Sequence, residues 1–559
     1  MKPFWVTFYS YKGGVGRSLA LANIAALLVK RGRRVLLIDF DLEAPGLASF
    51  AELSAAAGRP GVVEYVADFL RREAASDIRD YVHPCDLPGP LRGKLWVMPA
   101  GKCDDVYNDH LSQISWSKLY ESGLGAPFFA NWQAAIESHF RPDYVFVDSR
   151  TGLTEIGGVC TTQFPDLVMM LFALNEQNVN GVATVAQSIR EADPDRVPQI
   201  HFVATPVPNL PPVIDKQIPN RRSQLVERLE SAAERLGVKI SSTIHYYAPA
   251  SLSEKMFVLE DGFTKQRISN DYEQLCEKIV EFNRTGLDFL MEQGATLIAE
   301  GDSTRMERLE TVLQRDYSDR AEAIYLRARF AVARNQMSQA IELAQRAFQE
   351  DPIYEDVFNF LCGYYIRLRQ PERVLELTDH IMERKEALPP ERRYKVRETR
   401  GEAFMALGQY PDAGICFSEC MEYAPKDSAD PEAMLTLAFN LAESTRRGHN
   451  VIEPNIWKQV VAFFGKVGTS SDAPLPIQAY RWQAMHVAYA CGGDLDAARE
   501  ALRKAQRAAE AAGEIEDIFS IAVYLPVPVF EFIEINKAMI EALERWELWD
   551  GMNLSAVGG

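Results

Sequence analysis

The sequence lacks several features that mark common classes of protein. Its eight cysteines include no C-x-x-C pair, which fits a reducing cytosol better than a disulfide framework. No uninterrupted apolar run reaches the roughly 18 residues of a membrane span, and the N-terminus begins with a strand-like run rather than a secretory signal. We therefore expect a cytoplasmic protein that does not enter the membrane.

The composition also gives little sign of a metal centre or of general affinity for nucleic acid. His83, His110, His139 and His201 show no metal-ligand spacing, and Cys416 and Cys420, four apart on a predicted helix, favour packing. The net charge is −18, unlike the basic balance of proteins that coat nucleic acid. We interpret the densest basic stretch, KRGRR at Lys30–Arg34, as a helix end, where cations favour the dipole, although a local basic patch remains open.

The first half of the chain alternates strand and helix signals. This alternation predicts an α/β fold with a mostly parallel sheet and helices on both faces. Continuous apolar runs, rather than alternating ones, fit strands that are covered on both sides. We assign this domain to residues 1–295, and its strands are expected at Phe4–Ser10, Arg34–Asp41, Lys94–Gly101, Asp143–Gly152, Asp166–Leu174 and Gln199–Pro208.

After about Gly301 the strand signal vanishes, and we expect an all-α domain over residues 296–550. Two blocks that end at Pro352 and Pro425 share small and aromatic positions. This pattern resembles the tetratricopeptide repeat (TPR), whose arrays usually present a concave surface to a protein partner. The matching positions are Ala328, Ala331, Ala340 and Ala344 in the first block and Gly401, Phe404, Ala413 and Phe417 in the second. A plain helical bundle is the alternative, and residues 428–471 are not assigned to repeats.

The stretch YSYKGGVGRSLALANIA, at Tyr9–Ala25, has the form of a phosphate-binding loop that opens onto a helix. Glycines let the backbone wrap phosphates, and the helix N-terminus attracts negative charge. A serine hydroxyl, here Ser18, would hold Mg²⁺. The standard GxxxxGK[ST] pattern fails at two positions, where Tyr11 replaces the first glycine and Arg17 replaces the lysine.

The motif KGGVGRS at Lys12–Ser18 resembles the KGGxGK[ST] loop of the ParA/MinD family of deviant Walker ATPases. LLIDFDLEAPGL (Leu36–Leu47) and DYVFVDSRTGL (Asp143–Leu153) resemble the two switch segments of that family. The resemblance implies that ATP and Mg²⁺ bind, that two copies close face to face as a homodimer, and that hydrolysis reverses the closure.

By this resemblance, each motif position acquires an expected role. Lys12 would cross the dimer interface to the partner's nucleotide, Asp39 would orient the attacking water, and Asp148 would reach Mg²⁺ through water. Arg17 joins Lys12 and Asp39 in the expected catalytic set, and Ser18 binds the metal. The remaining nucleotide contacts are expected from Gly13, Gly14, Val15, Gly16, Arg17, Ser18, Leu19, Asp41, Gly152, Thr205 and Pro206.

Arg17 keeps the positive charge of the lysine, but its planar fork differs from an ammonium point charge. Because positioning carries most of phosphoryl transfer, we expect slow ATP hydrolysis with nucleotide binding retained. The sequence thus predicts an ATP-dependent switch whose helical domain recruits or regulates an unidentified protein.

Three alternatives stay open or are disfavoured. A non-hydrolysing nucleotide scaffold is compatible with Arg17, and a DNA-associated partitioning ATPase is less favoured. A bacterial tyrosine kinase shares this loop type, but residues 544–559 contain no tyrosine. That acidic tail also disfavours attachment to a membrane by a basic amphipathic helix.

Overall fold

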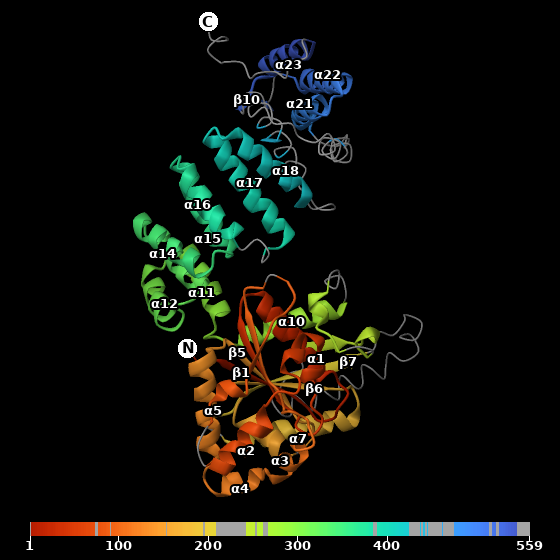
Figure 1. Cartoon of the computed structure of the whole chain (residues 1–559), viewed down its shortest axis with the longest axis vertical. Helices are drawn as coiled ribbons and strands as arrows, with labels where there is room; N and C mark the ends of the chain where they lie inside the picture. Colours follow the sequence, from red (N-terminus) through yellow and green to blue (C-terminus); the bar gives the residue numbers. More distant parts are fainter. Residues whose placement is uncertain are drawn as a thin grey trace. The chain divides into compact units, whose positions relative to one another are not determined.

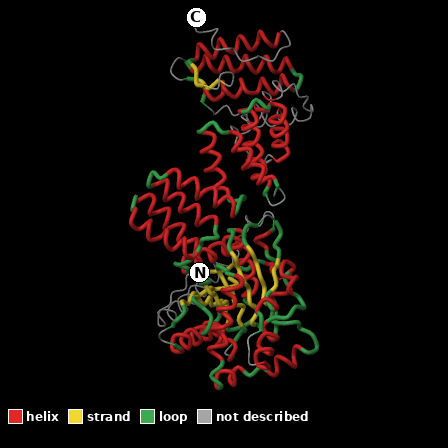
Figure 2. Tube along the Cα trace, turned by 60° about the vertical axis from the view of Figure 1, so that its left-hand side comes forward, coloured by secondary structure: helices red, strands yellow, loops and turns green. Residues whose placement is uncertain are grey.

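The computed structural model describes residues 2–72, 76–89, 91–152, 154–193, 196–207, 242–251, 254–260, 267–383, 388–423, 474–513, 517–520 and 525–544, with isolated positions between 437 and 461. Packing divides the chain into two compact units, Met1–Leu343 and Ala344–Gly559. The first contains the sheet and the second is mainly helical (Figures 1 and 2). The domain boundary expected near residue 295 stays a prediction. Pro425, most of 428–471 and residues 545–559 lie outside the described residues.

The described part of the first unit is built on an eight-stranded sheet. Its order is β3-β4-β2-β5-β1-β6-β7-β8, and only β3 runs antiparallel to its neighbour. The strands are β1 (Phe4–Ser10), β2 (Arg34–Phe40), β3 (His83–Cys85), β4 (Lys94–Met98), β5 (Tyr144–Ser149), β6 (Leu167–Phe172), β7 (Gln199–Val207) and β8 (Ser242–His245). The mostly parallel α/β sheet predicted from the sequence is therefore confirmed.

Helices cover both faces of this sheet, as the apolar runs predict. Side chains of α1 (Arg17–Lys30) and α10 (Arg267–Phe282) pack with Val6 and Phe8 on one face. On the other face, Trp5 packs with α2 (Val62–Arg72) and α5 (Gly125–Phe140), and Tyr9 packs with α7 (Glu176–Ala192). Alternate residues of β1 thus point to opposite cores, because successive strand side chains alternate between faces.

The stretch Lys30–Arg34 ends a helix, as expected. Helix α1 stops at Lys30, and Gly32 follows with φ 82°, a left-handed conformation that favours glycine. The basic side chains here have partners: Lys30 donates to the carbonyl of Val258, and Arg31 pairs with Glu277. Both side chains thus have partners within the first unit, and Lys30 is exposed.

The other two arginines of this stretch fasten the sheet to the first helices that follow it. Arg33 is buried and pairs with Asp288 of α11 (Leu287–Glu300), at 2.6 Å, and with Glu322 of α13 (Ala321–Ala333), at 3.2 Å. Arg34 pairs with Asp319 at 3.1 Å. Although burial alone would raise the pKa of Asp288, its hydrogen bond to Arg33 and the charge of Arg33 lower that pKa overall.

Arg320 completes this fastening from the helical side. Its guanidinium donates to both carboxylate oxygens of Asp143, at 3.2 and 2.9 Å, and to the carbonyl of Gly32 at 2.9 Å. Asp143 in turn accepts the backbone N–H of Arg34. A buried aspartate just before β5 is thus neutralised by an arginine from beyond residue 300.

The second unit contains the helix pairs α15–α16, α17–α18 and α21–α22 with a closing helix, α23. Their bounds are α15 (Glu355–Arg367), α16 (Pro371–Met382), α17 (Pro390–Ala406), α18 (Tyr410–Tyr423), α21 (Leu475–Cys491), α22 (Leu495–Ala512) and α23 (Val529–Glu544). A Cβ added at Gly401 would lie 2.5 Å from the ring of Phe417, so the glycine lets α17 and α18 approach closely. Cys416 and Cys420 are both buried in α18, as packing residues would be. The TPR assignment itself stays a prediction.

The run of packed helices predicted after Gly301 is confirmed, with one short addition that the sequence pattern does not indicate. A short antiparallel pair, β9 (Ile518–Ser520) and β10 (Leu525–Val527), precedes α23. Ile518 and Val527 are buried in a core with α22 and α23. A strand of three residues is too short to show a repeating pattern of apolar and polar positions in the sequence.

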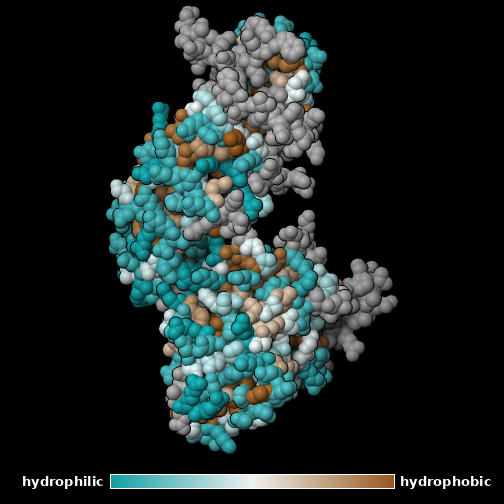
Figure 3. Space-filling model, viewed as in Figure 1, coloured by the Kyte–Doolittle hydropathy of each residue, from teal (hydrophilic) through white to brown (hydrophobic). Residues whose placement is uncertain are grey.

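The described surface shows no broad apolar band in the view of Figure 3, where hydrophobic colour is confined to small patches. Within the described residues, no helix is both long and apolar enough to cross a bilayer.

We predict that Arg320→Met lowers the free energy of unfolding by about 3–5 kcal/mol, because it leaves the buried Asp143 without its counter-charge. Urea denaturation followed by circular dichroism measures this loss. Arg315→Met is the matched control, since Arg315 is exposed and pairs only with its neighbour Asp316 in the described structure; it should change nothing measurable. Equal stability of the two variants would contradict a structural role for the Arg320–Asp143 pair.

Candidate functional site

The strand order brings the predicted motifs to one edge of the sheet. Strands β2 and β5 are parallel neighbours, and Asp39 lies directly opposite Asp148 in their register. Strand β1 lies on the other side of β5 and leads into the glycine loop. Since ligands of open α/β sheets bind beyond the carboxyl ends of the strands, the loop and both aspartates occupy the expected place.

The loop itself has the geometry of a phosphate cradle. Gly14 and Gly16 have φ values of 77° and 79°, which side chains other than glycine rarely adopt. A Cβ at Gly13, Gly14 or Gly16 would meet nothing within 4 Å, so this backbone borders open space. Helix α1 begins at Arg17, with its N-terminal N–H groups at the loop.

A pocket of about 370 Å³ opens at this loop. The loop and the start of α1 contribute most of its lining, and the remaining residues come from the end of β1, from the two switch segments, and from Phe50 and Glu254. The full set is Ser10, Gly13, Gly14, Val15, Gly16, Arg17, Ser18, Leu19, Asp41, Gly46, Phe50, Thr151 and Glu254. Sequence reasoning missed Ser10, Gly46, Phe50, Thr151 and Glu254. Thr151 and Gly46 fall inside the quoted switch segments, whereas no local signal marks Glu254.

Tyr11, the first departure from the standard loop pattern, is accommodated by helix α7. A Cβ at Gly181 of α7 would lie only 2.2–2.5 Å from atoms of the Tyr11 ring. The ring therefore occupies space that any larger residue at position 181 would take. The loop can carry a tyrosine here because its neighbour is a glycine.

Arg17, the second departure, is buried and bridges two aspartates. Its Nε donates to Asp148, and a terminal nitrogen donates to Asp41 at 2.8 Å. Burial alone would lower the pKa of Arg17, but the charges of Asp148 and Asp41, together with the hydrogen bonds to them, raise that pKa above its ordinary value. The residue expected at the phosphates thus lies, in this structure, between the ends of β5 and β2.

Asp39 is fully buried at the end of β2 and anchors the first switch segment. Its carboxylate accepts backbone N–H groups from Asp41 (3.1 Å), Gly46 (3.2 Å) and Leu47 (3.1 Å). Burial, and then the charge of Asp148, raise the pKa of Asp39, against the effect of these donors. Asp39 is held by the segment that contains Asp41 and Gly46, both of which line the pocket.

Asp148 and Ser18 suit a magnesium ion. Mg²⁺ prefers oxygen ligands and keeps several waters. The second oxygen of Asp148, Oδ2, is buried and has no hydrogen-bond partner in the described part of the chain. Burial raises the pKa of this carboxyl, whereas Arg17 and the nearby Ser18 hydroxyl oppose that rise. The donor set therefore fits Mg²⁺, which Ser18 and, through water, Asp148 would hold.

The other expected residues surround the pocket without lining it in the described structure. Lys12 is exposed and donates to the side chain of Gln177. Gly152 has φ 79° and accepts the hydroxyl of Tyr9 at 3.1 Å. Thr205 is buried and donates to the carbonyl of Val15 at 3.1 Å, and Pro206 follows it at the surface. Thr205 thus supports the glycine loop from behind, and its expected contact with adenine stays a prediction.

The two switch segments are also connected by a direct ion pair. Arg150, in the segment after β5, pairs with Glu43, in the segment after β2. Arg150 adjoins Thr151, which lines the pocket. A ligand that moves one segment would therefore disturb the other.

A family comparison agrees with this geometry. The model of the CobQ/CobB/MinD/ParA nucleotide binding domain matches residues 6–293. The chain belongs to this family. The match includes the glycine loop, both aspartate-ended strands and the two switch segments, so nucleotide binding is the family property of the first half of the chain.

Individual proteins of known structure are more distant. An ATP complex of Cyanothece McdA is 15% identical, covers 50% of this chain and 97% of its own, and has a TM-score of 0.38. The cell division ATPase MinD of Pyrococcus furiosus is 20% identical, with coverages of 50% and 99% and a TM-score of 0.34. MinD of Pyrococcus horikoshii in complex with Mg-ADP is 17% identical, with coverages of 50% and 96% and a TM-score of 0.33.

One curated relative matches over a shorter stretch. The succinoglycan biosynthesis transport protein ExoP of Rhizobium meliloti (strain 1021) is 33% identical over 133 residues, which are 24% of this chain. The chain spans only 14% of the length of that protein.

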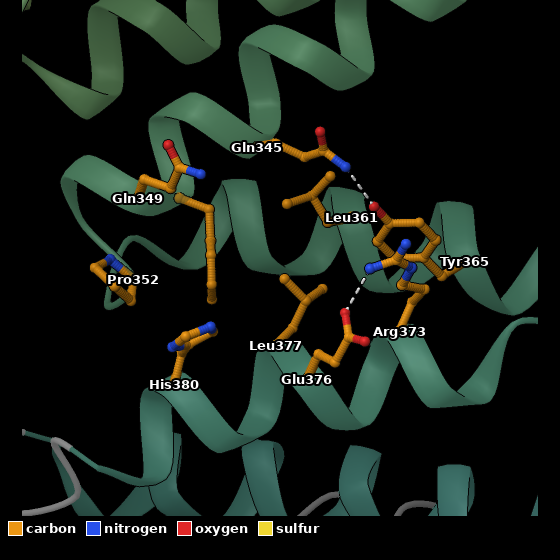
Figure 4. Close-up of a pocket in the computed structure, with 10 residues that line it drawn as sticks. Gln345, Gln349, Pro352, Leu361, Tyr365, Arg373, Glu376, Leu377 and His380 are labelled. Atoms are coloured by element: carbon orange, nitrogen blue, oxygen red, sulfur yellow. Dashed lines mark hydrogen bonds and ion pairs between the residues drawn. The ribbon is translucent and has the colours of Figure 1, made fainter.

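A second hollow, of about 440 Å³, lies in the helical unit. Figure 4 shows Leu361 and Leu377 projecting into it from α15 and α16. Gln345 donates to the hydroxyl of Tyr365 at 2.7 Å, and Arg373 pairs with Glu376 at 2.7 Å at its edge. Apolar side chains beside a polar edge are the usual composition of a contact surface for another protein.

We predict that Thr205→Val weakens nucleotide affinity about 2- to 12-fold, the equivalent of one hydrogen bond of about 0.5–1.5 kcal/mol. The loss should be equal for ATP and GTP, because Thr205 supports the loop that surrounds the phosphates. Titration with fluorescent analogues of both nucleotides measures it, and Thr205→Ser, which keeps the hydroxyl, is the control. A loss confined to ATP would instead indicate contact with adenine.

Proposed function

We propose that this protein is an ATP- and Mg²⁺-dependent dimerising switch with slow ATPase activity, whose helical domain recruits or regulates a protein partner. The observation that carries the proposal is the arrangement at one sheet edge. A glycine loop, the Ser18 hydroxyl and the partly unpartnered Asp148 carboxylate lie together there. Both switch segments contribute residues to the same pocket. The relatives named above include an ATP complex and a Mg-ADP complex, which is consistent with this choice of ligand.

Each part of the site has a task in this proposal. Loop amides from Gly13 to Ser18 bind and orient the phosphates, and bound Mg²⁺ would neutralise charge on the phosphate oxygens. Asp39, the buried carboxylate nearest Asp148 in the sheet register, positions the attacking water once the first switch segment releases one of its oxygens. Lys12 is exposed at the mouth of the loop, where a second copy can approach it.

The switch would operate through the segments that cover the pocket. Asp41 and Gly46 are connected to Asp39, and Thr151 adjoins the Arg150–Glu43 pair. A bound triphosphate contacts both segments at once, so its presence or loss changes the surface that they form. In the helical unit, the hollow of Figure 4 is the candidate surface for the partner.

The ion pairs of Arg17 favour a second candidate, a nucleotide sensor that does not hydrolyse ATP. Arg17 occupies oxygens of Asp148 and Asp41, which a catalytic metal and its waters would otherwise use. Phosphate release measured over hours separates this candidate from the slow ATPase.

We predict that ATP with Mg²⁺ converts the wild-type protein from monomer to dimer in size-exclusion chromatography with light scattering. Lys12→Ala should abolish the dimer and leave nucleotide affinity within about twofold, since Lys12 is exposed and lies outside the pocket lining. Lys94→Ala, an exposed lysine at the start of β4, is the matched control. A monomer in apo, ADP and ATP states alike would rule out the dimer switch.

A further inference from the structure

The position of Arg17 suggests a role beyond holding phosphate. We propose that Arg17 is the resident counter-ion of the magnesium site, so that Arg17 and Mg²⁺ neutralise the Asp148 carboxylate in turn and the metal enters only after a triphosphate has drawn the guanidinium away. This inference rests on the proposed function, because it concerns the order in which that site is filled.

The first support is the geometry of the bridge. Arg17 is only 7% exposed, and its two contacts reach the carboxylates at the ends of two neighbouring strands. A guanidinium presents several donors in a planar fork, whereas a lysine ammonium is a single point charge. The arginine can therefore hold both acids at once, which fits its presence where this family's motif has lysine.

The second support is electrostatic. A cation of charge two placed against Asp148 would lie within a few ångströms of the guanidinium, in a buried site where like charges repel strongly. Asp148 is 0% exposed, so solvent does little to screen that repulsion. The guanidinium and the metal therefore compete for Asp148 through their charges, even though Oδ2 of that carboxylate has no hydrogen-bond partner in the described part of the chain.

The third support is that the Arg17 guanidinium has an alternative position close by, in the pocket. Its terminal nitrogen NH1 is buried and has no hydrogen-bond partner in the described part of the chain, so one donor of the fork is uncommitted. Arg17 also lines the pocket together with Gly13, Gly14 and Gly16. Phosphate oxygens bound at that loop would be strong acceptors for the guanidinium. They would replace the hydrogen bonds that Arg17 makes to the two aspartates.

This exclusion makes a binding order measurable. Without nucleotide, the wild-type protein should bind Mn²⁺, used alone as a magnesium probe, only weakly. ATP should bind in the presence of EDTA, because Arg17 and the loop amides supply the charge. Metal and triphosphate should then strengthen each other's binding, as reciprocal coupling requires.

The test measures Mn²⁺ binding by electron paramagnetic resonance without nucleotide, in wild type, Arg17→Gln and Arg17→Lys. We expect Arg17→Gln to bind Mn²⁺ at least about tenfold more tightly than wild type, equivalent to about 1.4 kcal/mol, with Arg17→Lys between them. Adding Asp148→Asn to Arg17→Gln should remove this binding, which shows that the metal occupies the proposed site. Equal Mn²⁺ affinity in wild type and both Arg17 variants would overturn the proposal.

Two further measurements keep the outcomes distinct. Arg17→Gln leaves buried carboxylates without their counter-charge, so thermal melting checks that it folds; if it does not, Arg17→Lys, which keeps a positive charge, decides the comparison alone. A fluorescent ATP analogue is titrated in parallel with EDTA. Failure of every variant to bind ATP would refute the proposed function, whereas ATP binding with unchanged Mn²⁺ affinities would refute only the role of Arg17.

Discussion

Two buried carboxylates on neighbouring strands set the main constraint on this molecule. The register of β2 and β5 places Asp39 opposite Asp148, and both are 0% exposed. Two buried carboxylates on adjacent strands repel each other, and little water is present to screen them. Each must therefore be neutralised, protonated or hydrogen-bonded. The structure uses three backbone N–H groups for Asp39 and the guanidinium of Arg17 for Asp148. The first switch segment and the start of α1 are thereby built around these two acids.

Ion pairs also fix the opposite, amino-terminal ends of the same two strands. Arg33 and Arg34 lie at the beginning of β2, and Asp143 lies just before β5; their partners Asp288, Asp319 and Arg320 come from beyond the sheet. Because these contacts are mostly buried, moving the strands would expose or separate several charges together. Conformational change at the site is therefore expected in the segments after the strands, where Asp41, Gly46 and Thr151 lie, rather than in the strands themselves.

Much of the sheet follows from the sequence, because long apolar runs identify buried parallel strands. Strand β1 has the predicted bounds, and the aspartates at the ends of β2 and β5 lie together as parallel strands require. The missed strands β3, β8, β9 and β10 have three or four residues each, and β3 contains a proline, so no periodicity reveals them. Phe50 and Glu254 line the pocket because the folded chain brings them there, and neither lies in a motif that the sequence reveals. The sequence shows that Arg17 is unusual, but its partners depend on the register between strands.

The two departures from the standard loop pattern are both compensated by their surroundings. Tyr11 has a glycine, Gly181, beneath its ring, and the charge of Arg17 is matched by Asp41 and Asp148. A buried arginine without such partners would destabilise the fold by several kcal/mol, and a tyrosine against a larger residue would displace the loop. The same loop keeps the left-handed glycines and the serine that phosphate and metal binding need. These features describe a loop whose surroundings accommodate both departures from the standard pattern. In the proposed order of binding, control of such a site lies in the competition between one guanidinium and one metal ion for the same carboxylate, Asp148.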